Sequence, residues 1–250
     1  LLFMGLGSNL LVRDGGFAGT VVCLYDTGGA DWQAITHLDT HLDNGHLLIG
    51  AGVHCATLAK QAVQAGKKDC AFLIGVPGTF GGALAMNAGA HAQETWTHVM
   101  RVQMLTRSGA LRSYDKSAFE IGYRHVVPPA EAVCFVSAEL ALPADDGTEA
   151  QHLKDWLMRR KATQPVGKPS CGSVFRNPPN DHAARLIESS GLKGFAIGDA
   201  VVSEKHANFI VNEGSAKPSE LEAVLRHVRA TVQAKTGVRL VPEVKIVGVD

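Results

Sequence analysis

The spacing of apolar and polar positions predicts an amphipathic helix near the end of the chain. Ser219 and Glu222 have the spacing of a capping box just after Pro218, and Gly237 is the predicted stop. Between them, apolar side chains recur along one helical face at Leu221, Val224, Leu225, Val228 and Val232. The same criteria predict two shorter helices.

The shorter helices lie within residues 182–194 and 55–66. In the first, "HAARLIESSGLKG", we expect Ala184 to be buried with Leu186 or Ile187, and Gly191 to end the helix. Apolar, β-branched runs with the length of strands occur at residues 20–25, 46–50, 133–142 and 243–248. Interleaved helices and strands predict a mixed α and β fold.

The stretch "PADDGTEA", residues 143–150, is the best candidate for a linker. It is acidic, rich in small residues and free of periodic apolar positions. We therefore expect two domains, residues 1–145 and 146–250.

Composition narrows the class of function. Lys and Arg together number 24, as do Asp and Glu, so the formal net charge is zero and nucleic acid is not an expected partner. No stretch approaches the length of a membrane span. The cysteines at positions 23, 55, 70, 134 and 171 are scattered and lack zinc-site spacing, which favours reduced thiols in a cytoplasmic protein without a bound metal.

Glycine is the informative excess, with 27 residues in the chain and two dominant clusters. The first, "GLGSNLLVRDGGFAGTVV" (5–22), opens with small residues whose N–H groups can converge on an anion, yet it lacks P-loop and G-x-G-x-x-G spacing. The second, "GVPGTFGGALAMNAGAH" (75–91), suits a backbone pressed against a flat ligand and its phosphates. Either cluster alone is equally consistent with tight turns.

The stretch "KPSCGSVFRNPP" (168–179) places Ser173 between a glycine and two apolar residues. The residue two beyond is Phe175, so the G-x-S-x-G signature of hydrolase nucleophiles is absent. Two interpretations remain. Ser173 either donates a proton to a strongly basic partner or is a turn residue bonded to its own backbone.

In this order, the two glycine clusters and the Ser173 stretch resemble one family, the UDP-N-acetylenolpyruvoylglucosamine reductases, which are the MurB flavoenzymes of peptidoglycan precursor synthesis. Several blocks in register are far more specific than any one of them. The further blocks are "YRH" (123–125), "LIESSGLKG" (186–194), "VSEKHANFIVN" (202–212) and "LVPEVKIVG" (240–248).

The resemblance implies an α+β protein, in which an FAD-binding domain of the vanillyl-alcohol-oxidase type precedes a smaller α+β substrate domain. It implies the cofactors FAD and NADPH, and a sugar-nucleotide substrate. Hydride would pass from NADPH to FAD and then to the enolpyruvyl carbon C3, giving UDP-N-acetylmuramate. The implied flavin contacts are Gly5, Gly7, Ser8, Asn9, Pro77, Gly78, Thr79, Gly82, Asn87 and Gly89.

The same resemblance implies three catalytic residues. Hydride addition at C3 leaves negative charge on C2 and its carboxylate, a base that can take a proton from Ser173 without a neighbouring His or Asp. Arg124 matches the arginine that holds the substrate carboxylate, for which a planar guanidinium is suited. Glu243 matches a glutamate beside the site, useful when protonated or bridged by water. Without the family blocks, Arg124 is interpreted as a surface salt bridge and Glu243 as a solvated strand residue.

The resemblance also implies that Lys161, Asn177 and His206 contact phosphate or substrate, although a core histidine is an equal alternative for His206. Cys171 lies two residues from Ser173, and a thiol is the better acid. The family motif nevertheless puts its serine after glycine, so we expect Cys171 to be a packed neighbour.

The sequence departs from the family pattern in two places. The family normally begins with a small βα-rich segment before "GSNLLV", so we expect part of the flavin cradle to be missing from the sequence shown. The interval from Arg124 to Lys161 has no inserted tyrosine-bearing loop, which indicates the loop-less subclass. Two other functions stay open: a flavin oxidase of the same fold, and a non-catalytic nucleotide-binding remnant.

Overall fold

The computed structural model describes residues 1–25, 37–40, 42 and 45–250. They form two compact units. Unit 1 comprises Leu1–Leu6 and Val21–Arg159, and unit 2 comprises Gly7–Thr20 and Arg160–Asp250. Unit 2 therefore contains a segment from each end of the chain.

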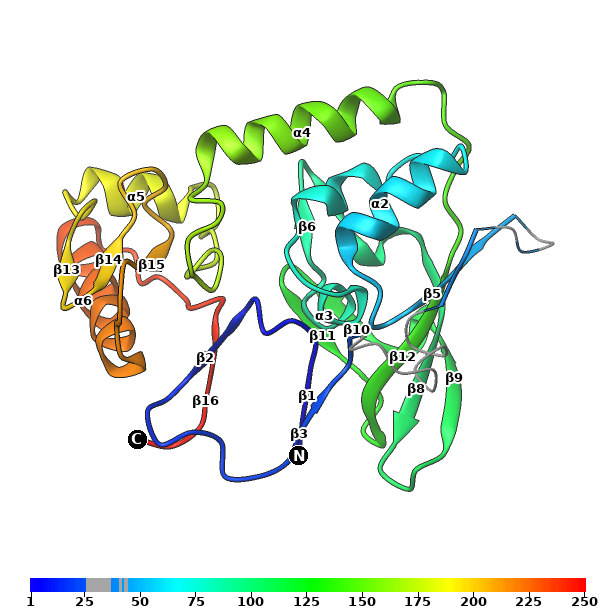
Figure 1. The fold of residues 1–250 in the computed structure, drawn as a ribbon, viewed down its shortest axis with the longest axis horizontal. Helices are drawn as coiled ribbons and strands as arrows, with labels where there is room; N and C mark the ends of the chain where they lie inside the picture. Colours follow the sequence, from blue (N-terminus) through cyan, green and yellow to red (C-terminus); the bar gives the residue numbers. More distant parts are fainter. Residues whose placement is uncertain (26–36, 41, 43–44) are drawn as a thin grey trace. The chain divides into compact units, whose positions relative to one another are not determined.

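Unit 1 is built around a five-stranded antiparallel sheet with the strand order β4-β5-β12-β8-β9 (Figure 1). Buried and half-buried residues alternate along most of β12, as expected for a strand with one face on a core. Strands β5 and β12 confirm the predictions for residues 46–50 and 133–142. The strands are β4 (Leu38–Asp39), β5 (Leu47–Gly50), β8 (Val99–Thr106), β9 (Leu111–Asp115) and β12 (Ala132–Leu140).

Shorter elements complete unit 1. The parallel pair is β1 (Leu2–Met4) with β3 (Val21–Cys23); the antiparallel hairpins are β6 (Gly89–Ala90) with β7 (Gln93–Glu94), and β10 (Glu120–Gly122) with β11 (His125–Val127). The helices are α2 (Cys55–Gln64), α3 (Phe80–Met86) and the start of α4 (Glu149–Thr163), and the 3₁₀ turns are η2 (Ala71–Gly75), η3 (Thr95–His98) and η4 (Lys116–Ala118).

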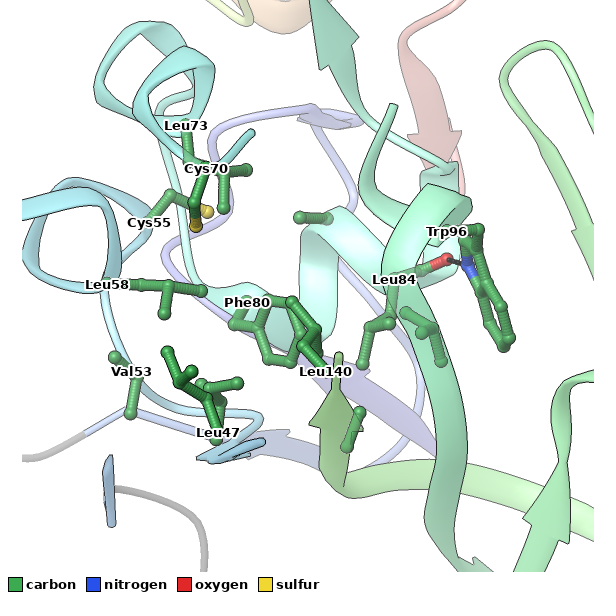
Figure 2. Close-up of a cluster of buried hydrophobic side chains, with 14 of the residues drawn as sticks. Leu47, Val53, Cys55, Leu58, Cys70, Leu73, Phe80, Leu84, Trp96 and Leu140 are labelled. Atoms are coloured by element: carbon green, nitrogen blue, oxygen red, sulfur yellow. Dashed lines mark hydrogen bonds between the residues drawn. The ribbon is translucent and has the colours of Figure 1, made fainter. Parts of the chain in front are cut away.

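The main core of unit 1 fixes α3 against the sheet. Phe80, the first residue of α3, is fully buried in the same apolar cluster as Leu47 and Leu58 (Figure 2). Trp96 is also buried, and its indole N–H donates to the Leu84 carbonyl at 2.7 Å, which satisfies the polar edge of the ring. Because α3 belongs to the second glycine cluster, the core sets the position of that cluster.

All five cysteines are free thiols. Cys55 and Cys70 lie in the core of unit 1 (Figure 2), where burial raises the pKa of Cys55 to about 12 and also raises the pKa of Cys70. These thiols stay protonated and act as small apolar side chains.

Unit 2 combines a parallel strand pair, a small antiparallel sheet and two helices. The apolar face predicted for α6 is confirmed, since Val224, Leu225, Val228 and Val232 are buried, and Gly237 ends the helix with φ of 76°. The elements are β2 (Leu10–Val12) with β16 (Lys245–Val247), β13 (Ala196–Ile197), β14 (Ala200–Val202), β15 (Ile210–Asn212), α5 (Ala183–Ser189) and α6 (Pro218–Thr236).

The predicted helix starts need two corrections. The capping box at Ser219 and Glu222 is wrong. Pro218 already occupies the first turn, so Lys217 is the N-cap, and its N–H donates to Glu220 Oε2 at 2.8 Å. In α5 the buried alanine is Ala183 instead of Ala184, because Ala183 precedes the buried Leu186 and Ile187 by three and four residues and so shares their helical face.

Helix α4 was not predicted, because its apolar stripe is limited to Leu153, Trp156 and Leu157, which pack against the core of unit 1. The indole ring of Trp156 lies between two imidazoles, stacked on His91 with centroids 4.4 Å apart and on His152 with centroids 5.1 Å apart. At its start, buried Glu149 accepts the Ala71 N–H through Oε2 at 3.2 Å. The predicted linker at 143–150 therefore runs directly into a packed helix.

The compact units also divide the chain differently from the predicted domains, 1–145 and 146–250. One boundary falls within α4, between Arg159 and Arg160, and the segment Gly7–Thr20 packs with the C-terminal residues because β2 pairs with β16. The functional roles assigned to the two domains stay a prediction.

Among the described residues, no helix combines the length and apolar character needed to cross a bilayer. Within that same part of the chain, no group of three or more His, Cys, Asp or Glu side chains could hold a metal ion.

Candidate active site

The first glycine cluster is divided between the two units. Gly5 belongs to unit 1, where a Cβ would overlap the Thr79 hydroxyl, so glycine lets the two predicted flavin-binding segments touch. Gly7 belongs to unit 2, has φ of 69°, and accepts the Leu10 N–H at 3.0 Å. This turn places Ser8 and Asn9 immediately before β2.

Asn9 joins this turn to the segment that carries Glu243. Its Nδ2 donates to the Glu243 carbonyl at 3.2 Å, and its own carbonyl accepts the Lys245 N–H at 3.0 Å. A predicted flavin contact and a predicted catalytic residue are thus neighbours in unit 2. Sequence reasoning did not foresee this contact, because 234 positions separate the two residues.

The second glycine cluster turns sharply into α3. Pro77 is exposed, Gly78 has φ of 120°, a conformation that favours glycine, and Thr79 is the buried N-cap of the helix. All three belong to the predicted flavin contacts. Of the three, Gly78 has the backbone conformation that requires glycine.

Consecutive glycines of α3 face opposite sides. A Cβ at Gly81 would lie 2.8 Å from the Cβ of Ala51, so Gly81 is required for close packing inside unit 1. A Cβ at Gly82 would meet only Thr79 Oγ1, at 3.8 Å, so Gly82 presents uncovered backbone on the outer side of the helix. Gly78 and Gly82 together fit FAD, whose flat ring and phosphates need close approach to a backbone.

Asn87 organises the end of the second cluster. It is buried in the left-handed conformation, with φ of 43°, as the C-cap of α3. Its Nδ2 donates to Glu94 Oε2 at 2.9 Å and to the Gly122 carbonyl at 3.0 Å, while its Oδ1 accepts the Trp96 N–H at 3.2 Å. Both amide hydrogens are therefore used within the protein, and the predicted flavin contact of Asn87 has to come from other atoms.

Arg124 occupies the turn between β10 and β11, with φ of 52°. Its Nη1 donates to the Asn87 carbonyl at 3.2 Å and its Nη2 to the Gly89 carbonyl at 2.7 Å. The guanidinium carbon also lies 5.0 Å from the centre of the Tyr123 ring. The orientation of this predicted carboxylate-binding side chain is therefore set by the second glycine cluster.

The segments of Ser173 and Glu243 lie side by side in unit 2. The Glu243 N–H donates to the Val174 carbonyl at 2.8 Å, and Phe175 forms an antiparallel bridge with Pro242. Among the described residues of unit 2, Ser173 Oγ has no hydrogen-bond partner. The interpretation of Ser173 as a turn residue bonded to its own backbone is therefore not supported.

Cys171 is a packed neighbour, as predicted. It contacts the core of unit 2 and lines a cavity of about 230 Å³ together with Leu10, Leu225 and Val244. Burial raises the pKa of its thiol to about 11.

The three predicted substrate contacts come from separate segments of unit 2. Lys161 is exposed in α4, and its carbonyl accepts a hydrogen bond from Lys205 Nζ at 2.5 Å. Asn177 Oδ1 accepts the Ala183 N–H at 3.1 Å, at the start of α5. His206 is half-buried, and its Nδ1 accepts the Asn208 N–H at 3.3 Å, which leaves the proton of the neutral ring on Nε2. Their substrate contacts stay a prediction.

Sequence reasoning missed Asn208. This buried residue uses its side-chain amide to bind the backbone of Phe175. The available signal was its place in the apolar run "ANFIV", because a polar side chain in a buried strand needs a partner.

Comparison with known proteins agrees with this geometry. Residues 1–114 match the family described as FAD binding domain, and residues 164–247 match the family described as UDP-N-acetylenolpyruvoylglucosamine reductase, C-terminal domain. A curated reductase of that name from Alkalilimnicola ehrlichii is 50% identical, covering 99% of this chain and 80% of the relative. Another, from Methylococcus capsulatus, is 48% identical and covers 99% and 79%. The chain belongs to the UDP-N-acetylenolpyruvoylglucosamine reductase (MurB) family.

A crystal structure from the same family supports the fold. The reductase of Thermus caldophilus superimposes with a TM-score of 0.82 at 31% identity, covering 98% of this chain and 84% of that one. The predicted fold class is confirmed: an FAD-binding domain of the vanillyl-alcohol-oxidase type precedes the α+β C-terminal domain of the MurB family. The predicted FAD cofactor and oxidoreductase class are likewise confirmed, and the MurB family is not one of flavin oxidases.

The two glycines of α3 give a matched pair of variants. Gly81→Ala should destabilise the flavin-free protein by about 1–3 kcal/mol, because the added methyl overpacks against Ala51. Gly82→Ala should not destabilise it, since the methyl points to open space and alanine favours helix. Thermal unfolding of the flavin-free proteins measures both effects. Titration with FAD should show weaker binding for Gly82→Ala, and parent-like affinity would place the flavin elsewhere.

The second prediction concerns His206, whose pKa is lowered mainly by burial. Because the folded protein resists protonating this ring, the unfolded chain takes up the proton first as pH falls below about 6.5. The contribution of His206 to stability is therefore present above that pH and declines as pH falls towards the folded pKa. Urea unfolding at pH 7 and pH 5 measures the free energy of unfolding. Between these pH values it should fall more for the parent than for His206→Gln, and equal decreases would contradict the expectation.

Proposed function

We propose that this protein reduces UDP-N-acetylglucosamine enolpyruvate to UDP-N-acetylmuramate with NADPH, a cytoplasmic step of peptidoglycan precursor synthesis. The names of the curated relatives support the substrate, and the family resemblance supports NADPH as the reductant. One observation carries the assignment of residues: the main-chain bond from Glu243 to Val174 joins the segments of the proposed proton donor and the proposed site glutamate.

Ser173 is the proposed proton donor. When bound, FAD supplies the hydride that reaches carbon C3 of the substrate. Ser173 then gives its hydroxyl proton to C2, where negative charge has developed. Two observations support this role: Ser173 Oγ has no competing partner among the described residues of unit 2, and it follows Gly172 in the left-handed conformation, with φ of 74°.

Arg124 is the proposed carboxylate ligand. Its bonds to the Asn87 and Gly89 carbonyls hold the plane of the guanidinium, which presents paired N–H groups to two carboxylate oxygens. Charge on that carboxylate grows as hydride arrives, so the ion pair is stronger in the transition state than in the bound substrate. The role of Arg124 is supported by its position, because the two carbonyls that it binds belong to the second glycine cluster, which contains predicted flavin contacts.

Glu243 is the proposed acid or water-binding group beside carbon C2 of the substrate. Its main chain is held on two sides, by Asn9 Nδ2 at the carbonyl and by the Val174 carbonyl at the N–H. An anionic carboxylate there would oppose the developing negative charge, so the protonated form or a bridging water fits the reaction.

Substitution of Ser173 should separate the two halves of the reaction. Ser173→Ala removes a proton donor only, so FAD binding and flavin reduction by NADPH should stay near the parent level. Reoxidation of the flavin by the enolpyruvyl substrate should slow by roughly 10²- to 10⁴-fold. Stopped-flow absorbance of the flavin measures each half separately.

Two further variants serve as controls. Ser173→Cys should recover part of the rate because a thiol can donate, whereas Cys171→Ala should reoxidise like the parent because Cys171 is packed in the core. Parent-like reoxidation in Ser173→Ala would remove Ser173 as donor, and loss of FAD in that variant would assign it a structural role.

A lysine in place of Arg124 should preserve the positive charge and lose the paired N–H groups of the guanidinium. Arg124→Lys is expected to slow substrate reduction while flavin reduction by NADPH changes little, because an ammonium cannot bind both carboxylate oxygens in one plane. Steady-state turnover with the sugar nucleotide and anaerobic reduction by NADPH provide the comparison. Unaltered turnover would place Arg124 outside the site.

A further inference from the structure

Asn208 is buried beside the segment that carries Ser173, with 4% of its surface exposed. Its Oδ1 accepts the Phe175 N–H at 3.0 Å, and its Nδ2 donates to the Phe175 carbonyl at 2.8 Å. Its main-chain carbonyl accepts the Val174 N–H at 2.9 Å. One residue is thus bonded to both of the residues that follow Ser173.

The other end of the Ser173 loop is held by the same strand region. Ser170 forms an antiparallel bridge with Val211, and the Asn212 N–H donates to the Pro169 carbonyl at 3.0 Å. The loop is therefore anchored at both ends on residues 208–212.

Between these anchors the chain forms a β-bulge. Three residues, 171–173, separate Ser170 from Val174, whereas two residues, 209–210, separate their partners Asn208 and Val211, so the Ser173 segment has one residue more. Gly172 has φ of 74°, the left-handed conformation found at glycine bulges. Because a bulge redirects the side chains within it, the direction of Ser173 Oγ depends on where the two anchors hold the chain.

The N–H and C=O of Phe175 are paired by a side chain, because no main-chain group among the described residues bonds to them. The Val174 carbonyl and the Arg176 N–H are used by the 241–243 segment, so Phe175 opposite Pro242 points its N–H and C=O the other way. The Asn208 amide meets both groups with an acceptor and a donor, as a neighbouring strand would. Without it, both polar groups of a residue that is 1% exposed would be unpaired.

We propose that Asn208 is a positioning residue for the reduction, whose side chain locks the bulge and thereby fixes the direction in which Ser173 Oγ donates its proton. The inference rests on the proposed function, in which Ser173 is the donor. Asn208 acts through the backbone of Phe175 and does not touch the substrate.

The test compares the two half-reactions in the FAD-loaded protein. Asn208→Ala retains the main-chain bond to Val174, so FAD binding and reduction by NADPH should be unchanged. Reoxidation by the enolpyruvyl substrate should slow by up to about 10²-fold, the cost of misplacing a reacting group by about 1 Å. Reoxidation at the parent rate would overturn the inference.

Asn208→Asp adds a readout that loss of packing would not give. A protonated carboxyl carries both an acceptor and a donor and can bind Phe175 as the amide does, whereas a carboxylate has no donor. The reoxidation rate of Asn208→Asp, divided by the parent rate at the same pH, should therefore rise as pH falls. A ratio that is flat with pH would overturn the inference, even where Asn208→Ala fails to retain FAD.

Asn212→Ala is the matched control. Asn212 lies in the same unit, and its side-chain Oδ1 accepts the Gly214 and Ala216 N–H groups, each at 3.0 Å, whereas the alanine variant keeps the main-chain bond from Asn212 to Pro169. This variant loses a similar set of bonds and should reoxidise like the parent. An equal slowing in Asn212→Ala would overturn the inference by showing a general effect of loosening unit 2.

The double variant Ser173→Ala with Asn208→Ala separates the two proposals. If Asn208 acts through Ser173, the double variant should reoxidise no more slowly than Ser173→Ala alone. Additive losses would overturn the positioning role while leaving Ser173 as donor. Parent-like reoxidation of Ser173→Ala would instead overturn the proposed function itself.

Discussion

The parallel pairing of β2 with β16 is the constraint on which the arrangement of unit 2 depends. Leu10, Leu11 and Val12 lie in register with Lys245, Ile246 and Val247. Just beyond β2, the Arg13 guanidinium binds both Glu222 oxygens, at 3.1 and 3.2 Å, and this hydrogen bonding lowers the pKa of the Glu222 carboxyl. Through this pairing residues 7–20 belong to unit 2, whereas the residues before and after them belong to unit 1. The first glycine cluster is therefore divided after Leu6. It also brings Asn9 to Glu243, whose N–H in turn holds Val174 beside Ser173.

Periodic segments of the fold could be predicted from the sequence. Helix α6 has an apolar face that extends from Leu221 to Val232 and a glycine stop, and both are properties of local sequence. Helix α4 was not predicted, because its short apolar stripe packs on a core made by other parts of the chain, and Trp156 stacks on the distant His91 as well as on His152. The same limit applies to the membership of β2 in unit 2. Its partner is at the far end of the sequence, and no spacing rule connects them.

The site could be predicted only as a set of motifs. Gly81 and Gly82 are indistinguishable in sequence, yet one is needed for packing against Ala51 and the other leaves backbone uncovered. The family resemblance implies Asn87 as a flavin contact, whereas the structure shows that its amide hydrogens are engaged with Glu94 and Gly122. The role of each residue depends on which residue packs against it in the folded chain, and motif spacing carries no information about that packing partner.

Asn87 and Asn208 show how a chain with short strands and many glycines can hold the proposed catalytic side chains in place. Arg124 lies on a two-residue turn and Ser173 in a bulge, and neither backbone has a regular ladder on both sides. In each unit a buried asparagine supplies the absent partner. Asn87 Nδ2 binds the Gly122 carbonyl next to the Arg124 turn, and Asn208 binds both polar groups of Phe175. An amide is suited to this because it has the donor and acceptor of a peptide group, whereas a carboxylate would leave one group unpaired and leucine would leave both. The order of these two loops therefore depends on single buried side chains, which explains why rigid catalytic geometry is compatible with so much glycine.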